Sequence, residues 1–178
     1  MDPAQGTDPE KEALVTFDTV DPTSSVMTLP SHVHSGFTVS WAGVDDVNGA
    51  GIAGYDIYVR ENDGSWGIWK SNTTDTSAIF TGDPEKTYGF YSIASDNTGN
   101  REGIPAQADA ETLVIPYKKG DVNGDDIVDL ADAILTAKIT AGVDTGNATI
   151  ILDADVNGDQ KIGIIDLVYI LVRLAGLR

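Results

Sequence analysis

The strongest signal in this chain is the pair of segments DVNGDDIVDLAD, at positions 121–132, and DVNGDQKIGIID, at positions 155–166. The second repeats the first 34 residues further along, and each has an oxygen-bearing side chain at its first, third, fifth and twelfth positions. Calcium is a hard cation that takes about 6–8 oxygen ligands, and a twelve-residue loop with this spacing can wrap it. Two copies in register are hard to explain as chance turn chemistry. The repeat therefore predicts two calcium-binding loops.

Each loop offers both side-chain and backbone oxygens to one calcium ion. The seventh residue is expected to give its carbonyl oxygen. The ninth position differs, because Asp129 can act through a water, whereas Gly163 has no side chain to offer. Magnesium fits less well, because it dehydrates reluctantly and rarely uses all-protein cages. The predicted ligands of the two calcium ions are Asp121, Asn123, Asp125, Ile127, Asp129 and Asp132 in the first loop, and Asp155, Asn157, Asp159, Lys161 and Asp166 in the second.

Two positions of these loops depart from the EF-hand pattern. An EF-hand has glycine at the sixth position, where the chain turns sharply, but this chain has Asp126 and Gln160 there. Aspartate tolerates the left-handed backbone region and glutamine does so at some cost, so the second site is expected to be weaker or differently shaped. The twelfth ligand is aspartate rather than glutamate, and its shorter arm changes how the following helix sits over the ion.

An apolar helix is predicted after each loop. The one that follows the second loop is apolar nearly all round between Ile164 and Leu174, and such a helix must be buried on most sides. A module of about sixty residues cannot bury every face of one helix. Part of this helix is therefore expected to be exposed, which usually marks an interface. The alternative is that the N-terminal domain covers it.

Before Pro116 the sequence changes to short β-like runs separated by Gly, Asn, Asp and Pro clusters. Tyr55, Ile57 and Val59 are expected to share one face of a strand, with Asp56 and Tyr58 on the other. The Asn62-Asp63-Gly64 segment then supplies a hairpin turn. The predicted strands are Leu14–Phe17, Ser25–Thr28, Phe37–Trp41, Gly54–Arg60, Gly67–Lys70, Ser77–Thr81, Tyr88–Ala94 and Thr112–Ile115.

These β-like runs resemble fibronectin type III and related bacterial immunoglobulin-like modules. The resemblance covers roughly Ala13 to Ile115 and rests on the segments FTVSW (37–41), GYDIYV (54–59) and KTYGFY (86–91). It implies that Trp41 fills the core of the domain. It also implies that Tyr88 forms a tyrosine corner, with its hydroxyl bonded back to the backbone.

From about Gly120 to the C-terminus the chain resembles a type I dockerin. The resemblance rests on the duplicated loop and helix, on aspartate at each twelfth position, and on Val128 and Ile162 at the eighth. It implies that this region binds a cohesin module and so attaches a larger protein to a scaffoldin or a cell surface. Recognition in that family uses the tenth and eleventh loop positions and residues further along each helix. The matching residues are Leu130, Ala131, Ala137 and Lys138 in the first repeat, and Ile164, Ile165, Leu171 and Val172 in the second.

Composition and charge exclude several classes of function. The formal net charge of −17 argues against nucleic acid or an anionic membrane as a partner, because both need a basic face. The chain has no cysteine, which excludes disulfides and thiolate chemistry. No nucleophile with a plausible base, phosphate loop or recognisable acid pair is present, so no catalytic residue is predicted and the chain is not expected to be an enzyme.

Several alternatives remain open from the sequence. Met1 to Lys11 lacks the apolar segment of a signal peptide, so the chain is either part of a longer protein or cytoplasmic. Trp66 or Trp69 could stack on a sugar, although core packing explains them better. Asp45 and Asp46, with the turn at positions 96–100, could hold a third calcium, although turn chemistry explains them nearly as well.

The sequence therefore predicts a multidomain chain, with an all-β immunoglobulin-like sandwich followed by a small all-α module of two calcium-loop-helix repeats. The predicted bounds are 1–12 for a flexible N-terminal segment, 13–115 for the sandwich, 116–119 for a linker and 120–178 for the dockerin-like module. The expected function is calcium-dependent docking to a cohesin by an extracellular or cell-surface protein that is monomeric when free and does not insert into a membrane. The alternative is a calcium-stiffened spacer, or a carbohydrate-binding accessory module, without a cohesin partner.

Overall fold

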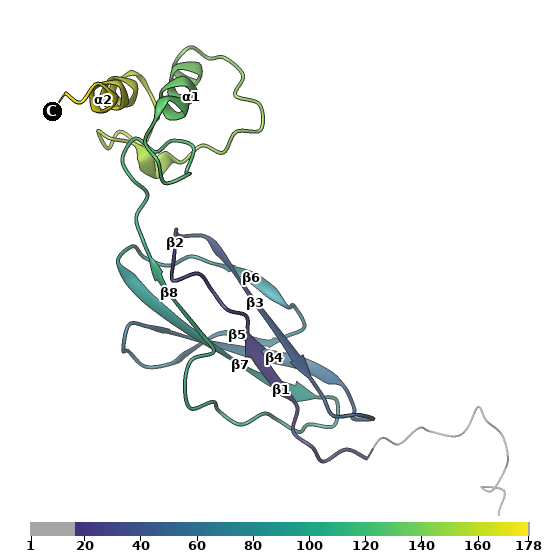
Figure 1. Cartoon of the computed structure of the whole chain (residues 1–178). Helices are drawn as coiled ribbons and strands as arrows, with labels where there is room; N and C mark the ends of the chain where they lie inside the picture. Colours follow the sequence, from purple (N-terminus) through teal and green to yellow (C-terminus); the bar gives the residue numbers. More distant parts are fainter. Residues whose placement is uncertain (1–16, 178) are drawn as a thin grey trace, which may run out of the picture. The chain divides into compact units, whose positions relative to one another are not determined.

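The structure is a computed structural model that describes residues 17–177 (Figure 1). The chain divides into two compact units. The first, here called the β unit, runs to Gly82 and resumes at Lys86–Leu113. The second, the loop unit, comprises Asp83–Glu85 and the chain from Val114 onward. The predicted flexible segment 1–12 and all but the last residue of the first predicted strand lie outside the described residues.

The β unit contains two sheets. The smaller sheet has the order β1-β3-β6 and the larger one has the order β2-β8-β7-β4-β5. The pairs β1–β3, β3–β6, β4–β5 and β4–β7 are antiparallel. The strands are β1 (Thr23–Val26), β2 (His32–Val33), β3 (Phe37–Val44), β4 (Ile52–Glu61), β5 (Gly67–Thr73), β6 (Ser77–Phe80), β7 (Lys86–Asp96) and β8 (Ala110–Val114).

Most of the predicted strands are confirmed, since every one from Ser25 onward overlaps an observed strand. The structure differs from the prediction at two places on the N-terminal side. Phe17 is in no strand and is 92% exposed, and the short strand β2 was not predicted. The predicted hairpin turn between β4 and β5 is confirmed, because Asn62 has a φ of 50° and the Gly64 amide donates to the Glu61 carbonyl at 2.9 Å.

The core of the β unit follows the alternation along its strands. Tyr55 and Ile57 are buried on one face of β4, as predicted, while Val59 is only half-buried. Trp41 is 1% exposed and meets Trp69 edge to face at 6.1 Å between ring centroids, so the core position implied by the resemblance is confirmed. Tyr88 is also buried, against Phe80.

Carboxylates from the segment between β7 and β8 join the two sheets. One oxygen of Asp109 accepts hydrogen bonds from the amides of Val26 in β1, at 2.9 Å, and Ser92 in β7, at 3.1 Å. Glu102 accepts from the Ser24 and Ala94 amides at 2.8 and 2.9 Å. The backbone donors of β1 and β7, which belong to different sheets, are thus satisfied by the same two side chains.

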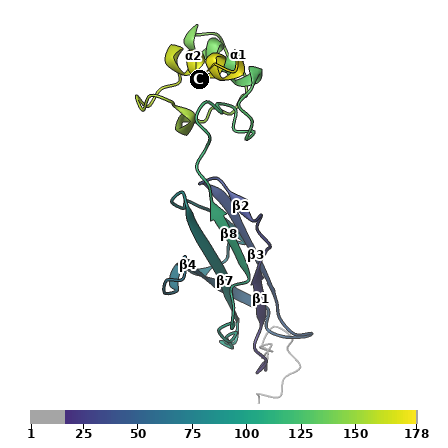
Figure 2. The same ribbon diagram turned by 60° about the vertical axis from the view of Figure 1, so that its left-hand side comes forward.

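The loop unit contains two helices, α1 (Leu130–Thr140) and α2 (Ile164–Leu174), and a 3-10 turn, η2 (Leu152–Ala154). Figures 1 and 2 both show α1 and α2 side by side. A small core of buried side chains holds this unit together, with Val122 and Ala154 from the loops and Ile170 from α2 among its members. Each helix has 11 residues, and neither is long and apolar enough to cross a membrane.

The predicted fold class is wrong. The described chain is mostly β-sheet, in two sheets, and its two short helices are too small a part of it to make an all-α module after an immunoglobulin-like sandwich. The physical reason lies in the loops. Positive φ angles at Gly124 (76°), Asp126 (68°), Gly158 (77°) and Gln160 (61°) are incompatible with a right-handed helix, so each loop stays irregular over most of its length.

Candidate calcium-binding loops

The two loops share one hydrogen-bond pattern at their first position. Asp121 accepts from the Gly124 amide at 2.9 Å and from the Asp126 amide at 2.9 Å. The corresponding Asp155 accepts from the Gly158 amide at 2.9 Å and from the Gln160 amide at 2.7 Å. The carboxylate at the loop start therefore holds the turn closed in both repeats.

The twelfth position also has the same role in both loops. One oxygen of Asp132 accepts from the Val122 amide at 2.8 Å, and the other accepts from the Asp129 amide at 2.8 Å. Asp166 accepts from the Val156 amide at 2.8 Å and from the Gly163 amide at 2.7 Å. Each twelfth-position aspartate thus reaches back from the first turn of its helix to the start of its loop. The sequence repeat is a structural repeat.

The third and fifth positions lie nearer the surface. The Asn123 amide group donates to Asp125 at 2.9 Å, and Asn157 donates to Asp159 at 3.0 Å. Both aspartates at the fifth position are exposed. Each loop therefore has two buried carboxylates at its ends and an exposed one between them.

The four carboxylates at the loop ends are buried, and none of them forms a salt bridge within the described residues. Asp121 and Asp132 are 0% exposed, Asp166 is 1% and Asp155 is 4%. Among residues 17–177, no lysine, arginine or histidine nitrogen lies within 4.0 Å of these side chains. Buried charges are usually paired or bound to a metal. Aspartate oxygens are the ligands that calcium prefers, so the residues at these loop ends fit the predicted ion.

The pKa of Asp155 is lower than the ordinary value for an aspartate. Burial by itself raises it, but the amides of Gln160, Gly158 and Asn157 donate to the carboxylate and outweigh the burial. The positive charge of Lys119 acts in the same direction. The Asp155 carboxyl is therefore ionised at neutral pH, as a calcium ligand must be.

The remaining predicted ligands are placed as follows. Asp129 is the N-cap of α1 and accepts from the Ala131 amide at 2.6 Å, so its side chain is engaged by the helix start. Gly163 is the N-cap of α2 and makes no such bond. Ile127 and Lys161, predicted to give carbonyls, follow the fifth-position aspartates, which accept from their amides at 2.9 and 3.0 Å. Neither loop has three acidic side chains with oxygens all within 4.8 Å of one another.

Two lysines of the predicted linker, Lys118 and Lys119, contact the loops. Lys118 donates to the carbonyl oxygen of Asp126 in the first loop. Lys119 donates to the carbonyl oxygens of Asp155 at 2.6 Å and Asp153 at 3.3 Å, at the start of the second loop. Two consecutive basic residues before an acidic loop were the only signal in the sequence.

The sixth position adopts the left-handed backbone in both loops, with φ of 68° at Asp126 and 61° at Gln160. Replacing Gln160 by glycine is therefore expected to raise the unfolding free energy of the loop unit by about 0.5–1 kcal/mol, because glycine carries no steric penalty there. Urea unfolding followed by circular dichroism at 222 nm, in saturating calcium, measures this. Asp126→Gly is the matched control and should gain less, since aspartate tolerates this region. A lower midpoint for Gln160→Gly would contradict the assignment of strain.

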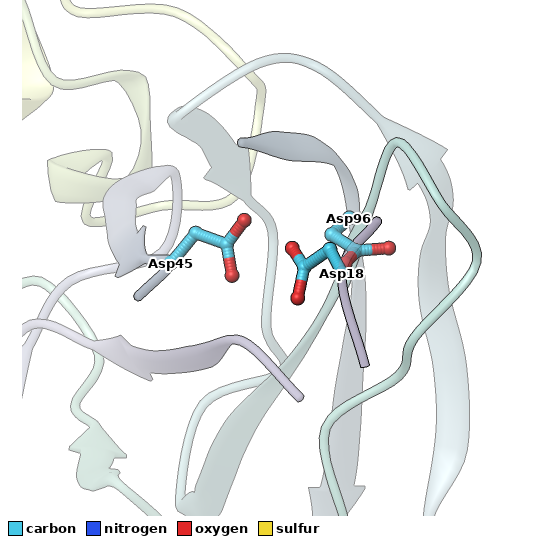
Figure 3. A group of neighbouring side chains, drawn as sticks. All are labelled: Asp18, Asp45 and Asp96. Atoms are coloured by element: carbon cyan, nitrogen blue, oxygen red, sulfur yellow. The ribbon is translucent and has the colours of Figure 1, made fainter. Parts of the chain in front are cut away.

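A separate acidic cluster lies in the β unit. Carboxylate oxygens of Asp18, Asp45 and Asp96 are within 4.8 Å of one another, and Figure 3 shows Asp45 pointing toward the other two. Asp45 and the turn that begins at Asp96 were expected from the sequence, whereas Asp18 was not, and Asp46 is not in the group. Asp18 and Asp45 accept from the amides of Ala50 and Gly51 at 2.7 and 2.6 Å. The arrangement is that of carboxylates closing turns.

Asp96 is the most heavily hydrogen-bonded member of that cluster. Burial raises its pKa, but the side chains and amides of Asn100 and Thr98 donate to it and bring the pKa down to about 2. Since this is below the ordinary 3.8, the stability that Asp96 contributes is present above about pH 4 and is lost as the pH falls toward 2. Urea midpoints measured by tryptophan fluorescence should therefore fall steeply between pH 4 and 2. Asp96→Asn should show a shallower fall, and an equal slope in both proteins would contradict this role.

The tryptophans offer no paired sugar platform. Trp69 packs edge to face against Trp41 and Phe80 inside the β unit. Trp66 meets the buried Tyr91 at 4.5 Å between centroids, with the Arg60 guanidinium 4.9 Å from its ring. The two indoles thus belong to different clusters, and core packing explains Trp69.

Seven of the eight predicted partner contacts are exposed. Ile164 is 58% exposed, Ile165 is 54%, Leu171 is 46% and Val172 is 39%. Val168, which was not among the predicted contacts, is 52% exposed. These five residues form one stripe along α2, because residues at these spacings share a helix face. The exposure expected of this helix is confirmed with respect to the rest of the loop unit. On α1, Ala137 is only half-buried rather than exposed, and the exposed positions are Leu130, Ala131, Ile134, Lys138 and Thr140.

The end of this stripe borders a hollow of about 680 Å³. Its lining includes Tyr169, Val172 and Arg173 of α2, and Gly176 and Leu177 beyond the helix. The Arg173 guanidinium donates to the Tyr169 hydroxyl at 3.2 Å on this side. The apolar surface of α2 therefore continues past the helix end into a concave region with a polar edge.

Comparison with known proteins adds little. No family model matches the chain. Among solved structures the chain is similar to a twitchin kinase region from C. elegans (Fn31-NL-kin-CRD-Ig26), with 23% identity and a TM-score of 0.40. The similarity covers 54% of this chain and 15% of that chain. A likeness this low carries no argument about fold or function.

Proposed function

We propose that the loop unit is a calcium-dependent protein-docking module of the dockerin kind, which binds a cohesin and thereby attaches a larger secreted protein to a scaffoldin or a cell surface. The observation that carries the proposal is the exposed apolar stripe of α2, formed by Ile164, Ile165, Val168, Leu171 and Val172. In this proposal the loop unit serves attachment rather than catalysis.

The stripe supports an interface because it is contiguous and lies on a regular element. Soluble proteins expose single apolar side chains everywhere, but a row of large ones on one helix face usually marks a binding surface. Burying such a face against a partner is worth roughly 25 cal/mol for each Å² removed from water. The helix thus presents aliphatic anchors of the kind that fill pockets on a partner.

Calcium in the two loops would support the same proposal, because the loops precede the helices that carry the interface. Asp132 and Asp166 fix the starts of α1 and α2, because each accepts a hydrogen bond from the N-cap amide of its helix. Without a counter-ion, repulsion between the carboxylates of one loop offsets part of the stabilisation that their hydrogen bonds to the loop amides provide. An ion in each loop would supply folding free energy directly and would fix the orientation of the helices that carry the interface.

The two helices are not equivalent as docking surfaces. Positions 34 residues apart correspond, so Lys138 on α1 takes the place of Val172 on α2, and Ala131 takes the place of Ile165. The α1 face is therefore smaller and ends in a charge. We infer one preferred docking mode, led by α2, rather than two equal modes related by the internal repeat.

The test is a binding screen of the full chain against a panel of cohesin modules, in calcium and in EDTA. Submicromolar binding to at least one cohesin, abolished by EDTA, is the expected result. Calcium uptake without binding to any cohesin would instead favour the calcium-stiffened spacer. Failure to take up calcium at either loop would end the proposal.

A further inference from the structure

The starts of the two loops are tied to each other by hydrogen bonds. The Gly120 amide donates to the Ala154 carbonyl at 2.9 Å, and the Ile151 amide donates to the Val122 carbonyl at 3.0 Å. Lys119 adds a side-chain bond of 2.6 Å to the Asp155 carbonyl. We call these two segments, Lys119–Val122 and Ile151–Asp155, the loop-start clamp.

The clamp includes or touches predicted calcium ligands of both loops. In the first loop, the Val122 amide donates to Asp132 while the carbonyl of the same residue accepts from Ile151. In the second, Asp155 is both a predicted ligand through its carboxylate and an acceptor for Lys119 through its carbonyl. Val122 and Asp155 therefore each make one bond within their own loop and one bond to the other segment of the clamp.

Close packing keeps the two segments from moving independently. Val122 and Ala154 are both 0% exposed and belong to the same core. Gly124 approaches Ile151 so closely that a Cβ at the glycine would lie 2.9 Å from the isoleucine side chain. Since protein interiors are close-packed, a shift at the start of one loop must be passed to the other.

We propose that the two loops bind calcium with positive coupling transmitted by the loop-start clamp, and that Lys119 is the positioning residue that couples them. This rests on the proposed function only in requiring that the loops bind calcium. The first ion orders the clamp and so meets part of the ordering cost of the second site, which raises the affinity of that site. Lys119 donates to carbonyl oxygens, so it leaves the Asp155 carboxylate available to the ion.

The direction of the change in calcium affinity distinguishes coupling between the loops from direct repulsion between Lys119 and the ion. A lysine beside a cation site repels the cation, so removing its charge would by itself tighten calcium binding. Removing the clamp would have the opposite effect on the second ion. Lys138→Met is the matched control, because it removes the same charge from the loop unit at an exposed position of α1.

The experiment is calorimetric titration of the full chain with calcium chloride. Asp125→Ala disables the first loop and Asp159→Ala the second, both at exposed side chains. Each is expected to weaken the surviving loop at least tenfold, by the same factor in the two directions, since coupling free energies are reciprocal. In the Lys119→Met background this factor should fall below about threefold, whereas Lys138→Met should keep it.

The outcomes are distinguishable. Two ions bound with affinities that do not depend on each other would overturn the coupling and leave the proposed function intact. If the loss of affinity at the surviving loop were just as large in the Lys119→Met background, the role of Lys119 would be overturned. No uptake by the unmodified chain would overturn both. Circular dichroism in saturating calcium checks that each variant folds. If Asp125→Ala does not, Asp125→Asn, which keeps an oxygen to accept the Ile127 amide, replaces it.

Discussion

Chelating calcium with EDTA is expected to abolish most of the helical circular-dichroism signal at 222 nm while leaving tryptophan fluorescence unchanged. Both helices belong to the loop unit, whereas all three tryptophans, at positions 41, 66 and 69, belong to the β unit. Helices of 11 residues are marginal in water on their own, because isolated helices need about 12–15 residues or more. They therefore depend on the small core that the loops complete.

The size of this effect follows from mass action. Calcium at about 100 times its Kd would stabilise the loop unit by about 2.7 kcal/mol for each occupied site, assuming that the unfolded chain does not bind it. Removing that contribution leaves the buried aspartates, such as Asp121 and Asp132, without a counter-ion. Adding back calcium should restore the signal, and magnesium at the same concentration should restore much less. A helical signal that is unchanged in EDTA would contradict the proposed coupling of calcium to folding.

Replacing both Ile164 and Ile165 by aspartate is expected to abolish partner binding, with a loss of about 10²–10³-fold in affinity. Both side chains are more than half exposed, so neither contributes much to the core of the loop unit. Their loss would leave charges facing the apolar pockets of a partner, and truncation of a central anchor alone typically costs 2 kcal/mol or more. The affinity of the full chain for the cohesin found in the binding screen measures this.

The matched variant is Leu130→Asp with Ala131→Asp, at the corresponding positions of α1. It introduces the same charges on the smaller face and should weaken binding less, by about tenfold or under. Calorimetry and circular dichroism establish that both variants still take up calcium and fold. Equal losses from the two pairs would contradict the preference for α2, and no loss from either would remove this surface as the docking site.

The loops were predictable because their determinants are local. The spacing of Asp121, Asn123 and Asp125 brings each side chain back to an amide two to five residues further on, so the turn closes with no help from the rest of the chain. The left-handed backbone expected at Asp126 and Gln160 is also present. Neither observation shows that calcium binds, which stays a prediction.

The class of the fold and the role of the linker were not predictable in the same way. Apolar periodicity after each loop suggested an all-α module, but the same loops exclude helix from most of the intervening chain. Lys119 was assigned only to a short linker, yet it bonds to residues 34 and 36 positions away. Asp109 likewise joins β1 to β7 across 83 residues of sequence. Contacts of such separation leave no periodic trace in a single sequence.

Most strands of the β unit, the left-handed backbone of the two repeated loops and the unequal chemistry of the two helix faces could be predicted from the sequence. All of these follow from residue identity at short spacing, where alternation, turn residues and side-chain length act within one element. Only the tertiary structure decided that the loop starts are clamped together, that α2 keeps its stripe at the surface while Ile170 is buried, and that carboxylates join the two sheets. Those features depend on which distant segments share a core, and packing is selected by the fit of many side chains at once rather than by any one of them.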